Sequence, residues 1–216
     1  MSAVSSSTDI ANWALDLMDE AEIQSLTENN KAARALNRQW QKTRTTVLSS
    51  AHWKCAKKVK NLSNDATAPT HPRWGYRSAL PGDLLVIIHL WDNNEDNVDT
   101  RPLPEEHWDR EAGYIHHDLE SDAALEYIYD NETVSDYGPL LAEAMAYHMA
   151  ASTAKKITGS DDISKLLKDQ YHRGILPEAQ RVEGNQGRVR ENLNLHRRLK
   201  RSPLFRARYN YRIGSA

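Results

Sequence analysis

The sequence predicts an α+β fold, mainly α, in which an antiparallel helical bundle carries a small inserted β-sheet and an extended basic C-terminal arm. Three observations support this class. Apolar residues recur at helical spacing near both ends of one folded domain, residues 9–182. Between them, residues 73–130 contain prolines, glycines and short alternating runs, which are typical of strands and turns. The last segment, residues 183–216, is strongly basic.

The first helix is predicted at about residues 9–24. Residues 1–8 before it are polar and small, and we expect them to be flexible. Thr8 or Asp9 is suited to cap the helix, because a short oxygen-bearing side chain can accept a bond from a free N–H of the first turn. Its apolar stripe comprises Ile10, Trp13, Ala14, Leu17, Met18 and Ala21.

The second helix is predicted at about residues 28–62. Residues 25–28 resemble a capping box, and no proline or glycine interrupts the pattern that follows. Ser49 and Ser50 could mark a kink in so long a helix. The stripe comprises Ala33, Leu36, Trp40, Thr43, Val47, Ala51, Cys55, Val59 and Leu62.

This second helix is also strongly basic. Arg34, Arg38 and Lys42 follow one another at a spacing of four and form a single row on the helix surface. The row is either solvated, paired with acidic residues of the first helix, in contact with a neighbouring subunit, or bound to a nucleic-acid backbone. The acidic candidates are Asp16, Asp19, Glu20 and Glu22, and the other basic residues are Lys31, Arg44, Lys54, Lys57, Lys58 and Lys60.

The inserted sheet is predicted from three runs. Leu84–Trp91 is almost wholly apolar, residues 113–117 follow a turn, and residues 124–129 alternate between larger and smaller side chains. Parallel neighbours need long crossover connections, so strands in an insertion of this size are expected to pair antiparallel. The acidic loop at 92–106, with two prolines, separates the first run from the others.

Two further helices are predicted at about 138–157 and 161–182. Pro139 is suited to the first helical position, and Gly159 to the left-handed position after the first helix. Ser160 can cap the second helix, and the short link makes the two helices antiparallel neighbours. The first stripe comprises Leu141, Ala144, Met145, His148, Met149 and Ser152, and the second Ile163, Leu166, Leu167, Gln170, Tyr171, Gly174 and Ile175.

The sequence offers little catalytic chemistry, and we predict no enzyme activity, no cofactor and no metal site. His116 and His117 are adjacent, so on a strand they face opposite ways and cannot both bind one metal. His148 lies on a buried stripe and is expected to be a core-edge histidine with a hydrogen-bond partner. A hydrolase that uses His148 or the histidine pair is the enzymatic alternative.

The compartment is expected to be reducing and aqueous. Cys55 is the one cysteine, so the chain cannot form an internal disulfide. The N-terminus lacks the basic and apolar regions of a secretory signal, and the longest apolar run is far shorter than the roughly 20 residues needed to span a bilayer. We therefore expect a soluble protein.

The ordered pieces resemble the head-to-tail adaptor family of short-tailed bacteriophages, known as tail tubular protein A. The order and spacing of many short pieces carry the resemblance over residues 9–182, since no single motif is diagnostic. The pieces are 10–15 with 23–26, 52–56, 74–76 with 80–83, 113–115, 125–127, 137–140, Ala144, Ala150, Ala154, and 157–160 through to Tyr171.

The resemblance implies a structural virion protein with a helical bundle and a β-rich insertion. Members form a dodecameric ring in the neck between head and tail, where they contact the portal protein and the tail nozzle protein while DNA passes through the bore. Localisation in the virion, and in the host cytoplasm during assembly, follows from the same resemblance.

The C-terminal arm lies beyond the matched block, and its role is our inference. Residues 188–212 hold nine Lys or Arg and one acid, which leaves nineteen basic and twenty-nine acidic residues elsewhere. Apolar residues interleaved with these charges favour docking on the portal. The alternatives are a nucleic-acid-binding tail that contacts phosphates and stacks on bases, and a disordered tail without a partner. The candidate residues are Arg197, Arg198, Lys200, Arg201, Leu204, Phe205, Arg206, Arg208, Tyr209, Tyr211 and Arg212.

Overall fold

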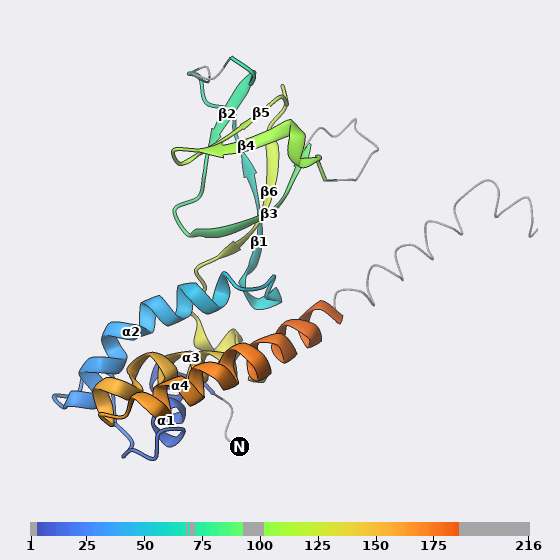
Figure 1. Cartoon of the computed structure of the whole chain (residues 1–216). Helices are drawn as coiled ribbons and strands as arrows, with labels where there is room; N and C mark the ends of the chain where they lie inside the picture. Colours follow the sequence, from blue (N-terminus) through green and yellow to red (C-terminus); the bar gives the residue numbers. More distant parts are fainter. Residues whose placement is uncertain (1–3, 68, 70–71, 93–101, 186–216) are drawn as a thin grey trace, which may run out of the picture.

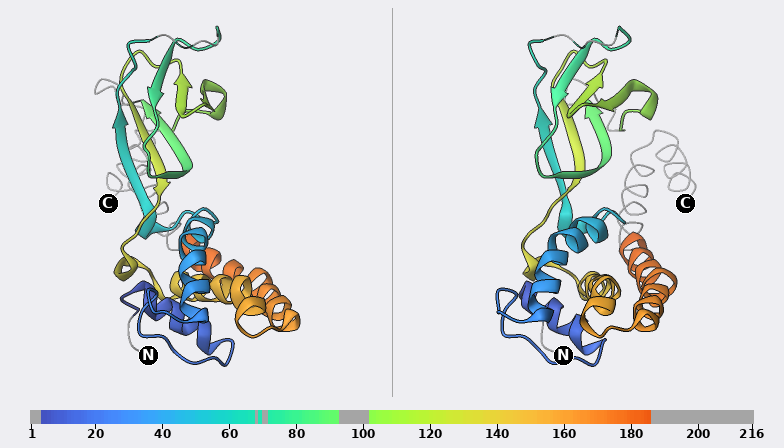
Figure 2. Two further views of the ribbon diagram at one scale, coloured as in Figure 1. Left: turned by 90° about the vertical axis from the view of Figure 1, so that its left-hand side faces the viewer. Right: turned by 60° about the vertical axis from the view of Figure 1, so that its left-hand side comes forward.

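The computed structural model describes residues 4–67, 69, 72–92 and 102–185, which form a helical module and a β module (Figure 1). Four α-helices build the helical module, and the β module is inserted between the second and the third. Both views of Figure 2 show the β module projecting from one side of the helical module. The helices are α1 (Ser7–Asp16), α2 (Lys31–Leu48), α3 (Pro139–Ile157) and α4 (Asp161–Gln170).

The β module consists of two three-stranded antiparallel sheets. The strand orders are β1-β6-β3 and β2-β5-β4. Side chains between the sheets, among them Leu62, Leu90, Ile115 and Leu125, form a separate apolar core. The strands are β1 (Lys57–Leu62), β2 (Tyr76–Ala79), β3 (Leu84–Asp92), β4 (Trp108–Glu111), β5 (Tyr114–His117) and β6 (Ala123–Tyr129).

The predicted architecture, a helical bundle with one small inserted sheet, is therefore wrong, although the α+β class is right. The three expected strands are present as β3, β5 and β6, and their antiparallel pairing is confirmed. The pattern missed β2 and β4, which have four residues each and are mostly exposed or half-buried. Such short strands carry too few alternations to be distinguished from loops.

The helical module is organised around α3, which contacts α1, α2 and α4. Its buried residues lie all round the helix rather than on one stripe, and Met145 and Met149 are fully buried. A helix that is apolar on every side belongs in the interior. The helical core also takes in Ile128 of β6, with Val86 and Ile88 of β3 packed against it, so the two modules share apolar contacts.

The turn between α3 and α4 agrees with the prediction. Pro139 is the first residue of α3, Gly159 has a φ of 78°, and the Ser160 side chain accepts a hydrogen bond from the Ile163 N–H. The predicted stripe of α4 is partly wrong, because Leu166 is 59% exposed whereas Leu167 is buried.

The N-terminal prediction was wrong in two respects. Residues 5–8 are ordered by a capping box in which Ser6 caps α1 and Asp9 bonds back to the Ser6 N–H, so neither Thr8 nor Asp9 is the cap. The helix ends at Asp16 rather than near 24, and Asp19 has a φ of 57°. A residue in this left-handed conformation cannot continue an α-helix, so the chain turns there.

The predicted helix 28–62 is three elements. Asn30 caps α2, through a 2.7 Å bond from the Ala33 N–H to its Oδ1 atom, so residues 25–28 are not the cap. The helix ends at Leu48, a short 3₁₀ turn follows at Lys54–Ala56, and residues 57–62 form β1. The apolar spacing beyond residue 48 was therefore coincidental, and Val59 is 63% exposed on β1.

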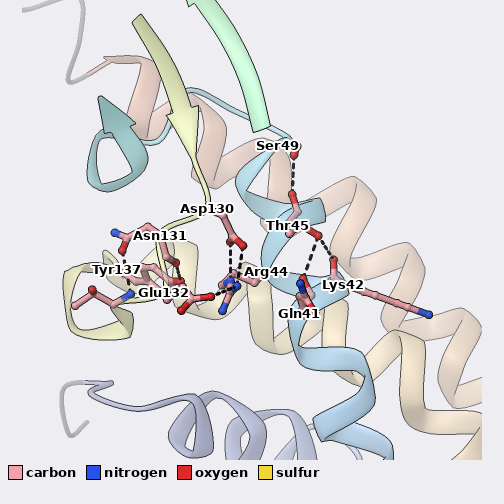
Figure 3. Close-up of polar contacts among 10 residues, drawn as sticks. Gln41, Lys42, Arg44, Thr45, Ser49, Asp130, Asn131, Glu132 and Tyr137 are labelled. Atoms are coloured by element: carbon pink, nitrogen blue, oxygen red, sulfur yellow. Dashed lines mark hydrogen bonds and ion pairs between the residues drawn. The ribbon is translucent and has the colours of Figure 1, made fainter. Parts of the chain in front are cut away.

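Side chains after Thr45 supply the physical reason for the end of α2. Ser49 donates a hydrogen bond to the Thr45 carbonyl oxygen (Figure 3), and Ser50 donates one to the Val47 carbonyl oxygen, each at 2.7 Å. The buried Trp53 indole N–H also donates to the Val47 carbonyl at 2.8 Å. Serine side chains compete with the helical backbone for its partners, and here they satisfy the carbonyls that a longer helix would have used.

Candidate functional site

The chain passes between the two modules twice, and Arg44 of α2 lies at this junction. Its Nε and Nη2 atoms donate to the two carboxylate oxygens of Asp130, each at 2.7 Å (Figure 3). Nη2 also donates to Glu132 at 2.7 Å. Arg44 is only 6% exposed, so a bidentate ion pair is enclosed where β6 leads back to the helices.

Asn131 makes the second set of junction contacts. Its Nδ2 atom donates to the Cys55 carbonyl at 2.7 Å, which joins the outgoing chain to the returning one. Its Oδ1 atom accepts from the Thr133 N–H, and the Tyr137 hydroxyl donates to its carbonyl oxygen. We call Arg44, Asp130, Asn131, Glu132 and Tyr137 the junction cluster. Because it joins both chain crossings to α2, it fixes how the β module is oriented on the helices.

Two residues of the junction cluster, Arg44 and Tyr137, keep their protons near neutral pH. Hydrogen bonding to Asp130 raises the pKa of Arg44, and burial raises the pKa of Tyr137 well above its ordinary value. Arginine therefore stays charged and the tyrosine stays protonated, so that it continues to donate its hydrogen bond.

The basic row Arg34, Arg38 and Lys42 is exposed on α2. The sequence left open whether it pairs with the acidic residues that were predicted to lie on the first helix. Within the described ranges, neither the row nor Asp16, Asp19, Glu20 and Glu22 takes part in an ion pair, so that pairing does not form inside the chain.

Ser78 and His117 form a pair that resembles a catalytic dyad, with 3.1 Å between Ser78 Oγ and His117 Nε2. However, the Leu119 N–H donates to His117 Nδ1, so the ring proton must lie on Nε2. Nε2 therefore donates to Ser78, whose hydroxyl donates to Asn64 Oδ1. A base that already carries its proton cannot accept one from the serine, and His117 is fully buried.

The other residues with catalytic potential are also structural. His148 is half-buried, lies 3.2 Å from the Thr43 hydroxyl and packs edge-on against Tyr171, as expected of a core-edge histidine.

Cys55 lies in the wall of a pocket of about 260 Å³, and burial raises its pKa to about 11. A thiol with so high a pKa is a poor nucleophile at neutral pH. In the described part of the chain no three His, Cys, Asp or Glu residues are grouped to hold a metal.

Acid should destabilise the protein through the buried His117 and the half-buried His148. Burial lowers the pKa of both His117 and His148 below the ordinary value of 6.5. As the pH falls, the unfolded chain takes up these protons before the folded chain does. The stability contributed by the two histidines is therefore full above about pH 6.5 and declines as the pH falls through the lowered pKa values.

Urea midpoints should therefore fall when they are measured from pH 7.5 down to pH 5. His117→Gln with His148→Asn should flatten that slope, and the exposed His107→Gln should not. An unchanged slope in the double variant would show that these histidines do not cause the decline.

The predicted portal-binding residues, Arg197 to Arg212, all lie outside the described residues, so their positions stay predictions. Sequence reasoning missed the junction cluster, because it treated Arg44 as one of many surface charges. A usable signal was present: Arg44 lies four residues after Trp40 and three before Val47, on the buried side of the helix. An arginine in that position requires a buried acidic partner.

A scan against protein-family models matched no family, and a search of curated proteins found no relative. Across the described residues, every helix is too short or too polar to cross a membrane.

Proposed function

We propose that the protein is a head-to-tail adaptor, a structural virion protein that forms a ring between the portal of a phage head and the tail. In this proposal the genome passes through the central channel, the tail nozzle protein binds the opposite side, and the C-terminal arm docks on the portal. The order of sequence pieces over residues 9–182 suggests the family. The structural feature that best supports an assembly role is the junction between the two modules, where the junction cluster fixes their relative orientation.

The junction cluster supports this role because an adaptor must hold two partners in a fixed relation. A bidentate pair at 2.7 Å, enclosed at Arg44, has a more defined geometry than an exposed ion pair. The shared apolar contacts of Ile128, Val86 and Ile88 resist tilting of the β module. Forces applied to one module would therefore reach the other without a hinge movement.

Unlike surfaces on the two modules also support ring formation. Val59 on β1 and Leu166 on α4 are exposed apolar residues on different modules. The α2 basic row and the acidic residues after α1 add two charged surfaces of opposite sign. Contacts between unlike surfaces of identical subunits generate rings when the rotation closes.

The alternative is a nucleic-acid-binding protein that uses the basic C-terminal tail. The exposed basic row on α2 favours it, because phosphate backbones attract arrays of Lys and Arg regardless of sequence. Such binding should weaken steeply as salt is raised, with a slope set by the number of phosphates contacted.

Light scattering and electron microscopy of the full chain, alone and mixed with its portal protein, test the adaptor proposal. We expect rings, alone or templated by the portal, at about 150 mM salt, where exposed charge pairs are already partly screened. A chain that remains monomeric with portal present and instead saturates on duplex DNA would replace the adaptor with the nucleic-acid alternative.

Deletion of residues 185–216 should separate folding from attachment. The helical and β cores lie before residue 185, so we expect the thermal midpoint to stay nearly unchanged. Attachment to portal-bearing heads should be lost, since the deleted segment carries the proposed anchors. Normal joining of heads by the truncated chain, or tighter binding of the isolated tail to DNA than to portal, would count against the arm.

A further inference from the structure

The α2 basic row points away from the protein core. Arg34, Arg38 and Lys42 lie one turn apart, on the face opposite the buried Leu36 and Val47. All three side chains are exposed, and α2 contains no acidic residue between Lys31 and Leu48. Like charges at this spacing repel one another, so the row is unfavourable unless a partner neutralises it.

A second surface of opposite sign begins at the last residue of α1. Asp16, Asp19, Glu20 and Glu22 form a tight turn, which we call the acidic turn. Its backbone is held by the Glu20 N–H, which donates to the Leu15 carbonyl at 3.1 Å. Asn12 closes the turn, because its side-chain amide exchanges two hydrogen bonds, of 2.9 and 3.0 Å, with the backbone of Ile23. The carboxylates are therefore presented on an ordered backbone.

Several other exposed charges of the helical module do pair within the chain. Asp161 pairs with Lys155 and Lys165, and Asp169 pairs with Arg173. By contrast, the basic row and the acidic turn have no ion pair in the residues that the structure describes. Two ordered surfaces of opposite sign are thus left unpaired on the same module.

We propose that the basic row of one copy docks on the acidic turn of a second copy. This inference rests on the proposed self-assembly and names the surfaces that carry it. A nucleic acid would neutralise only the basic row and leave the acidic turn unpaired, whereas a second copy satisfies both. Because the two surfaces differ, each subunit can bind one neighbour through its row and another through its turn, as a ring requires.

Charge reversal provides the test, in the full-length chain. One variant carries Arg34→Glu, Arg38→Glu and Lys42→Glu; the other carries Asp16→Lys, Asp19→Lys and Glu22→Lys. In light scattering with portal protein present, each variant alone should need at least a tenfold higher concentration than the wild type to assemble. An equimolar mixture should assemble like the wild type, because every row then meets a turn of opposite charge.

A matched control changes the same amount of charge elsewhere. The control variant carries Lys60→Glu, Lys156→Glu and Lys168→Glu. These three lysines are exposed and have no ion pair in the described structure, so the control should assemble like the wild type. Circular dichroism checks that all variants are folded.

If the reversed variants assemble like the wild type, the inference fails while the ring proposal stands. If the wild type itself never assembles, both fail. If the row variant, and not the turn variant, loses affinity for duplex DNA, the row binds nucleic acid instead of a second copy.

Discussion

Arg44→Met should lower the free energy of unfolding by about 3–5 kcal/mol, the usual cost of removing one partner of a buried ion pair. The variant would leave the Asp130 carboxylate, whose side chain is only 20% exposed, without its two hydrogen bonds from Arg44. Equilibrium urea denaturation, followed by both tryptophan fluorescence and circular dichroism, measures the loss. We also expect the two probes to separate, since the modules would no longer unfold as one unit.

Arg38→Met is the matched control, because it makes the same change at an exposed position on the same helix, and its effect should stay within about 0.5 kcal/mol. A double variant, Arg44→Met with Asp130→Leu, should regain part of the stability because no buried charge is left unpaired. A loss at Arg44 no larger than that at Arg38 would mean that the cluster does not hold the modules together.

Leu167→Ala should cost about 2–5 kcal/mol, the range for emptying a buried leucine site. Leu167 is 3% exposed and belongs to the helical core, on a helix that packs against α3. The neighbouring Leu166 is 59% exposed, so Leu166→Ala should change stability by no more than about 0.5 kcal/mol. The two variants make the same substitution one residue apart, which removes differences of chemistry from the comparison.

Thermal and urea midpoints of the two variants should therefore differ clearly. Equal losses at positions 166 and 167 would contradict the orientation of α4. If Leu166→Ala leaves stability unchanged but weakens ring formation, the exposed leucine belongs to an interface. That outcome would agree with the unlike surfaces on which the adaptor proposal depends.

The sequence predicted well where local chemistry decides the backbone. Pro139, Gly159 and Ser160 each have a preference for one position at a helix end, and the start and end of α3 and the start of α4 agree with it. The predicted helix 161–182 is divided, because α4 ends at Gln170 and a π-helical turn, Tyr171–Ile175, separates it from the helical residues 176–185. The apolar run Leu84–Trp91 became β3, with only one further residue. In these segments the local preference and the tertiary structure require the same conformation.

The prediction failed where residues far apart in the sequence determine the conformation. Residues 57–62 carry a spacing compatible with a helix, but β6 supplies backbone hydrogen bonds that make them a strand. Arg44 and Asp130 are 86 residues apart, and no periodicity in the sequence connects them. Ser78 and His117 likewise meet only through the pairing of β2 with β5. A periodicity search examines a window shorter than any of these separations.

The insertion of the β module between α2 and α3 has a consequence for biosynthesis. Residues 57–129 are contiguous, so the β module can close as soon as it has left the ribosome. The apolar faces of α1 and α2 cannot be buried until α3 has been synthesised, and α3 is made later than all six strands. At roughly 5–20 residues per second this delay lasts several seconds, during which the apolar faces of the N-terminal helices stay exposed. Asp130 directly follows the last strand and emerges before α3, so its pairing with Arg44 can be the first contact that brings the early helices to the finished strands.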